Sequence, residues 1–151
     1  MMPPLKRVRA SKNLSLNRFE AESSIDRAAD TVRTRFATPG KHQIYADKRN
    51  EAERYLTEAQ SGELPNLAGF PYLSAETGIT AETAADLAEL WIFMDSQWKQ
   101  VAALIEQITI GAKAQVRAAA SQAEIDTIIA TAAAYLDQIG ERPPERPPQK
   151  Q

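Results

Sequence analysis

An apolar repeat runs through residues 84–112, AADLAELWIFMDSQWKQVAALIEQITIGA. Its apolar members are separated alternately by three and four residues; they are Ala84, Leu87, Trp91, Met94, Trp98, Val101, Ile105, Ile108 and Ala112. This spacing is the heptad pattern of an α-helix that buries one face. Because no proline occurs between Thr80 and Pro143 to interrupt the backbone hydrogen bonds, the pattern predicts one long helix from residue 81 to about residue 120.

This apolar stripe has two interpretations. It is either the core-facing side of a bundle formed within the chain, or a surface partly shared with another chain, including a second copy of this one. Trp91 and Trp98 lie one heptad apart, and tryptophan is enriched among the residues that dominate binding at interfaces. Further apolar residues widen the stripe, which favours a bundle; they are Leu90, Ile92, Phe93 and Leu104. Both interpretations stay open, and Trp91 and Trp98 are candidate partner-binding residues.

Three shorter helices are expected around the long one. Apolar spacing predicts helices over residues 24–37 and 41–60, separated by a Pro-Gly turn. A loop over residues 61–73 leads to a single helical turn at 72–77, and a capping box at Ser121 opens a last helix that reaches residue 139. The predicted fold class is therefore all-α, an antiparallel helical bundle of about four main helices over residues 23–140.

The charge is distributed unevenly along the chain. The net charge is −2, but the first 19 residues hold five basic side chains and no acidic one, which leaves 13 basic and 20 acidic residues for 20–151. We expect residues 1–22 to form an extended basic arm, with three alternatives: a solvated terminus, an arm that orders on a partner, or a nucleic-acid contact. No aromatic side chain interleaves with the charges, so nucleic acid is the least favoured. The candidate partner-binding residues of the arm are Lys6, Arg7, Arg9, Lys12, Leu14, Leu16 and Phe19.

The composition excludes several kinds of chemistry. The 151 residues contain no cysteine and one histidine, His42, which excludes disulfides, thiolate catalysis and zinc sites built on cysteine or paired histidines. No glycine-rich phosphate-binding motif and no apolar run of membrane-spanning length is present. We therefore expect no enzyme, no cofactor, no metal and no membrane insertion. Residues 141–151 form a proline-rich tail, which we interpret as a spacer in preference to a ligand for a proline-binding groove.

The order of these elements resembles that of small bacteriophage tail proteins. The resemblance covers residues 24–139: an alanine-rich helix ending in Pro39-Gly40, a helix with Tyr45-x-x-Lys48-x-x-Glu51-Ala52, a short step at Glu76-x-Gly78-x-Thr80, a long tryptophan-containing helix and an alanine-rich closing helix. It implies a structural component of a phage tail, a baseplate or fibre-associated adaptor that assembles with other tail proteins and with itself. Such a protein would be made in the host cytoplasm and found in the virion.

Two alternatives to this function stay open. One is a tail-fibre assembly chaperone that is absent from the mature virion. The other is a nucleic-acid-binding regulator that uses the basic arm. The resemblance supplies no catalytic residues.

Overall fold

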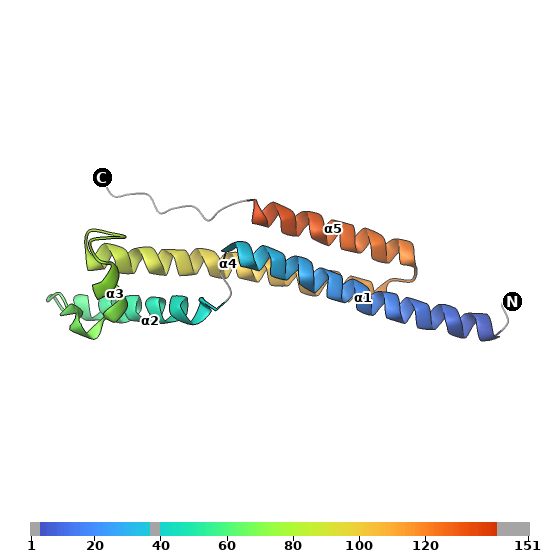
Figure 1. Ribbon diagram of the computed structural model, residues 1–151, viewed down its shortest axis with the longest axis horizontal. Coiled ribbons are helices and arrows are strands. Elements are labelled where there is room, and N and C mark those ends of the chain that lie inside the picture. Colours follow the sequence, from blue (N-terminus) through green and yellow to red (C-terminus); the bar gives the residue numbers. More distant parts are fainter. Residues whose placement is uncertain (1–3, 37–39, 142–151) are drawn as a thin grey trace. The chain divides into compact units, whose positions relative to one another are not determined.

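The computed structural model describes residues 4–36 and 40–141, and it is all-α, as predicted (Figure 1). The side chains of residues 4–13, 15 and 16 and all of the tail after Glu141 lie outside the described part. The elements in chain order are α1 (Pro4–Phe36), α2 (His42–Ala59), the 3-10 turn η1 (Leu67–Gly69), α3 (Pro71–Glu76), α4 (Ala84–Ala118) and α5 (Gln122–Gly140).

The helices from α2 onward begin and end within about three residues of the predicted bounds. The capping box of α5 is present, because the Ser121 hydroxyl accepts the backbone N–H of Glu124 at 3.2 Å. The Glu124 carboxylate in turn accepts the backbone N–H of Ala120 at 2.9 Å. The first bond satisfies a donor that the start of α5 leaves unpaired, and the second joins the residue before the N-cap to the first turn.

The expectation of an extended basic arm over residues 1–22 was wrong, because residues 4–22 belong to α1. Pro4 stands at the first helical position, where its missing N–H is not needed, and neither proline nor glycine occurs between Leu5 and Phe36. One uninterrupted helix of 33 residues results.

The chain divides into two compact units that share α4. The first unit contains α1, α4 from Val101 and α5; the second contains α2, η1, α3 and α4 up to Gln100. The expected single bundle over residues 23–140 is thus divided between two cores, each of which is described below by itself.

The register of the first unit follows from its polar contacts. Three ion pairs join α1 to α4, and the two residue numbers add up to 139 in each: Glu22–Arg117, Asp26–Lys113 and Arg33–Glu106. A constant sum is the signature of antiparallel helices. Asn17 hydrogen-bonds Gln122, 105 residues later, and Arg35 adjoins Gly140 at the same separation, so α1 and α5 are parallel.

Small and branched apolar residues fill the space between these three helices. One cluster includes Ala21, Ile25, Val116 and Ile125, and a second includes Val32, Ile105 and Leu136. The alanines of α1 and α5 let the two parallel helices approach closely, because little side chain separates their backbones. Leu14, the first residue of α1 whose side chain is described, packs against this core.

The core of the second unit is built around α2, α3 and the first half of α4. Leu73 and Leu87 are fully buried in it, and the rings of Tyr55 and Phe70 meet edge to face with centroids 5.4 Å apart. Glu51 is also buried, and its carboxylate accepts the backbone N–H of Leu73 at 2.7 Å. This bond satisfies a donor in the first turn of α3 and fastens that short helix to α2.

The apolar stripe of α4 is core within the chain over most of its length. Ala84, Leu87 and Trp91 are buried in the second unit, and Ile105 and Ala112 are buried in the first. Met94 departs from the pattern, because it is 54% exposed. The interpretation of the stripe as an intramolecular core is confirmed at the buried positions.

Candidate interaction surfaces

The basic segment of α1 projects beyond the end of the α4–α5 hairpin. Asn17 contacts Gln122, the first residue of α5, and Arg18 donates to the carbonyl oxygen of Ala119 at 2.5 Å. Leu14 still packs against the core that this hairpin helps to form. The ten helical residues before it extend about 15 Å further, at 1.5 Å per residue, and α1 projects past the hairpin (Figure 1). The predicted residues Lys6, Arg7, Arg9 and Lys12 belong to this N-terminal extension, residues 4–13 of α1, although their side chains lie outside the described part.

The three apolar candidates of the arm are in different surroundings. Leu14 is half-buried against the first unit's core, where it has a structural role. The side chain of Leu16 lies outside the described part. Phe19 is 67% exposed, so it stays a candidate for partner binding.

The two tryptophans belong to the second unit, whereas the extension belongs to the first. Trp91 is only 8% exposed and lies in the core, with the Lys48 ammonium 5.1 Å from its ring centroid. The prediction that Trp91 contributes to a self-association surface was therefore wrong. The Trp91 side chain packs in the core of the second unit. Trp98 is half-buried.

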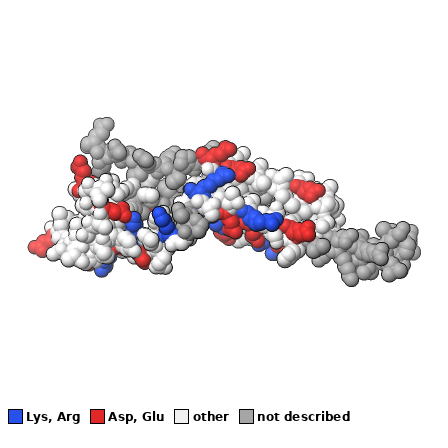
Figure 2. All heavy atoms as spheres, viewed as in Figure 1, with Lys and Arg blue, Asp and Glu red and all other residues white. Residues whose placement is uncertain are grey.

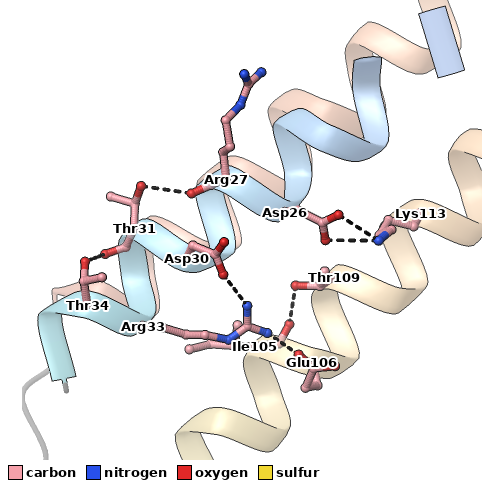
Figure 3. Close-up of polar contacts among 10 residues, drawn as sticks. All are labelled: Asp26, Arg27, Asp30, Thr31, Arg33, Thr34, Ile105, Glu106, Thr109 and Lys113. Atoms are coloured by element: carbon pink, nitrogen blue, oxygen red, sulfur yellow. Dashed lines mark hydrogen bonds and ion pairs between the residues drawn. The ribbon is translucent and has the colours of Figure 1, made fainter. Parts of the chain in front are cut away.

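A row of charged residues follows the line where α1 meets α4. The Lys113 ammonium lies 2.9 and 3.1 Å from the two carboxylate oxygens of Asp26. Two turns further, Arg33 donates to Asp30 at 2.9 Å and also to Glu106 (Figure 3). At the other end of the row, Arg117 lies 2.6 Å from Glu22. Figure 2 shows basic and acidic side chains adjoining one another on the visible face of this unit.

A shallow hollow of about 220 Å³ opens along this row of charges, lined by Asp26, Arg33, Glu106, Thr109, Ile110, Lys113 and Arg117. Each charged group in it already has an oppositely charged partner, and the Thr109 hydroxyl donates to the carbonyl of Ile105 at 2.7 Å. These charged groups therefore have a structural role: their ion pairs hold α1 against α4. The hollow offers neither a nucleophile beside a base nor an orphaned donor for a ligand.

The second unit has a hollow of about 310 Å³, lined by Asp47, Asn50, Glu51, Arg54, Pro71 and Tyr72. Its central groups also make structural contacts. Arg54 donates to the carbonyl of Gly69 at 2.6 Å and stacks over Phe70, and Glu51 caps α3. Both hollows thus lie between side chains whose contacts hold elements of the chain together.

Within residues 4–36 and 40–141 no group of three acidic, cysteine or histidine residues is arranged to hold a metal ion. None of the described helices combines the length and apolar character needed to cross a bilayer. His42 is exposed at the first position of α2.

Sequence reasoning missed the row of ion pairs. Glu22, Asp26 and Arg33 are spaced by four and seven residues, as are their partners Arg117, Lys113 and Glu106 in reverse order with opposite charges. That mirrored pattern is a signal present in the sequence. It predicts these ion pairs only once α1 and α4 are known to be antiparallel neighbours.

Comparison with known proteins gives no relative: no family model, curated protein or solved structure matches this chain.

Proposed function

We propose that this protein is a non-enzymatic structural adaptor of a bacteriophage tail, at the baseplate or beside the fibres. In this proposal the N-terminal extension of α1 docks on a neighbouring tail protein. The proposal is one of assembly: the partner is a protein surface, and no reaction, cofactor or metal is involved.

The observation that carries the proposal is the basic helix that continues beyond its own bundle. The ten helical residues before Leu14 belong to the part of α1 that projects past the hairpin (Figure 1), and isolated helices of that length are marginal in water. It gains stability when a partner covers it. Its four basic side chains, with no acidic residue among them, favour an acidic partner surface.

The assignment to a phage tail rests on the resemblance of residues 24–139 to small tail proteins, and the pairing of charges within the chain supports a non-catalytic role. The charged groups that line the hollows of both units make contacts that hold elements of the chain together.

The test uses phage that encodes either the full chain or a variant lacking residues 1–13. We expect the full chain in the proteome of purified particles, and a large reduction of the shortened chain. A full-length variant carrying Lys6→Gln, Arg7→Gln, Arg9→Gln and Lys12→Gln separates charge from helix length. Normal incorporation of both variants would contradict docking through the extension. Absence of the full chain from particles that require it for fibre assembly would instead identify a chaperone.

A nucleic-acid-binding regulator is a second candidate, favoured by the same run of basic residues without an intervening acid. It predicts binding to DNA or RNA that weakens steeply as salt rises, because bound counterions are released. We expect no binding at about 150 mM salt, in fluorescence anisotropy with labelled duplex DNA and single-stranded RNA. Tight binding with a steep salt slope, abolished by the four glutamine substitutions, would favour the regulator over the adaptor.

A further inference from the structure

The second half of α4 has an outward face that no other described element covers. Four residues on it are spaced by three, four and three positions, so they form a second heptad stripe, distinct from the buried one. These are Leu104, Gln107, Gly111 and Ala114, all exposed. We call them the outer stripe; Leu104 is 44% exposed.

The outer stripe carries no charge, because the charged residues of this part of α4 lie on the side that contacts α1. Between Val101 and Ala118, α4 has three charged residues, Glu106, Lys113 and Arg117, and each is paired with α1. At 3.6 residues per turn this charged row lies about 120° round the helix axis from the outer stripe. A surface helix ordinarily places charged residues on its solvent side. Here the solvent side can lose its water without the cost of burying an ion.

Side-chain size changes along the outer stripe in a way that makes it complementary to itself. The larger residues, Leu104 and Gln107, come first, and the smaller ones, Gly111 and Ala114, come last. When two copies lie antiparallel about a twofold axis at residue 109, Leu104 faces the partner's Ala114 and Gln107 faces the partner's Gly111. The same rule continues outward, where Gln100 faces the partner's Ala118. Each layer then pairs a large residue with a small one, as closely packed helices require.

We propose that a second copy of this chain packs antiparallel on the outer stripe of α4, forming a twofold-symmetric dimer. Parallel pairing fails the same size test, because it sets Leu104 against its own copy and leaves a gap where two glycines meet. Space for the partner exists at Gly111, since a Cβ atom added there would meet nothing within 4 Å. The stripe from residue 100 to residue 118 is about 27 Å long, so we expect a weak dimer, on the order of micromolar. This inference does not rest on the proposed function.

Reversing the size order tests the proposal with variants that keep the fold. Gly111→Leu fills open space in the single chain and replaces glycine by a better helix former, so the helix content and melting temperature should not fall. It should nevertheless weaken the dimer by at least about tenfold, because the added side chain clashes with the partner's Gln107. Adding Gln107→Ala restores a large–small pair and should restore dimerisation. Sedimentation equilibrium over 1–200 µM, an order-of-magnitude range about the expected affinity, measures each constant.

A matched pair of charge substitutions locates the surface. Leu104→Glu should abolish the dimer, whereas Tyr135→Glu, on α5 and outside the outer stripe, should leave it intact. Tyr135 is 56% exposed, so the control is at least as accessible as the test residue. Equal dimerisation by the two variants, or a wild-type chain that stays monomeric throughout the concentration range, would overturn the proposal.

Orientation is tested by disulfide formation, which is simple because the chain has no cysteine. A mixture of Gln107→Cys and Gly111→Cys chains should yield oxidised heterodimers, and either variant alone should yield few. Efficient cross-linking of Gln107→Cys to itself would show parallel pairing and reject the antiparallel dimer.

Discussion

The Glu51 carboxylate accepts the backbone N–H of Leu73 at 2.7 Å, and the two residues are buried in the core of the second unit. A carboxylate that is only 7% exposed is expensive to bury unless it is hydrogen-bonded. The bond is therefore a structural contact: it joins α2 to the start of α3, a helix of six residues that has little stability of its own.

Removing this carboxylate should destabilise the protein more than removing a neighbouring exposed one. We expect Glu51→Ala to lower the free energy of unfolding by about 1–3 kcal/mol, because the N–H of Leu73 loses its acceptor in a buried place. Glu51→Gln keeps an acceptor oxygen and should cost less than Glu51→Ala. Glu53→Ala is the control, since Glu53 is exposed and pairs only with Arg49 on its own helix. Urea denaturation measures all three, and an equal effect of Glu51→Ala and Glu53→Ala would show that the capping bond contributes nothing.

The ion pair between Asp26 and Lys113 should couple α1 to α4 measurably but weakly. Both side chains are partly exposed, so we expect a coupling free energy of about 0.2–1 kcal/mol from a double-mutant cycle with Asp26→Asn and Lys113→Met. The coupling should decrease between 0.05 and 1 M salt, because the Debye length falls from roughly 13 Å to about 3 Å. As a control, Asp26→Asn combined with Lys99→Met should be additive, since Lys99 pairs with Asp95. A coupling of Asp26 to Lys99 as large as that to Lys113 would contradict the register.

The two tryptophans should differ in both fluorescence and stability. Trp98→Phe leaves Trp91 as the only indole, and because Trp91 is buried its emission should be shifted to the blue and protected from acrylamide. Trp91→Ala should lower the free energy of unfolding by about 3–5 kcal/mol, as for other large buried aromatics. Trp98→Ala is expected to cost less, because Trp98 is only half-buried. Strong quenching of Trp91 in the Trp98→Phe chain would show that Trp91 is not enclosed.

The long helix could be predicted from the sequence because its heptad spacing is unbroken from Ala84 to Ala112. Because the spacing is unbroken, the sequence does not indicate that the chain divides into two units along α4. One stripe supplies two cores in succession, and its burial lapses between Trp91 and Ile105, where Met94 is exposed and Trp98 and Val101 are half-buried. Nothing in a helical period says which helix will cover it.

The helical N-terminus could not be predicted from apolar periodicity, because the apolar residues of the first 19 positions are irregularly spaced. A period is visible only where a core imposes it. The row of ion pairs was hidden for another reason: Asp26 and Lys113 are 87 residues apart, and their pairing depends on a register that is fixed by the packing of α1 against α4. The prediction for Trp91 failed for the same reason, because its burial depends on neighbours that only the tertiary structure supplies.

The N-terminal extension should be dispensable for the stability of the bundle. Deleting residues 1–13 keeps Leu14, which packs against the first unit's core, and removes residues from the part of α1 that projects past the hairpin. We expect the midpoint of urea unfolding to stay within the equivalent of about 0.5 kcal/mol of the full chain, as for surface changes. The far-ultraviolet circular dichroism should lose helical signal to the extent that the isolated extension is helical in solution.

Deleting residues 1–21 is the matched control, because it also removes Leu14, Arg18 and the buried Ala21. It takes away the hydrogen bond from Arg18 to Ala119 at the end of α4 and part of the first unit's core, so a lower unfolding midpoint is expected. A chain lacking residues 1–13 that unfolds as readily as the one lacking residues 1–21 would place the extension in the bundle's own core. Docking on a partner would then no longer be needed to account for the extension.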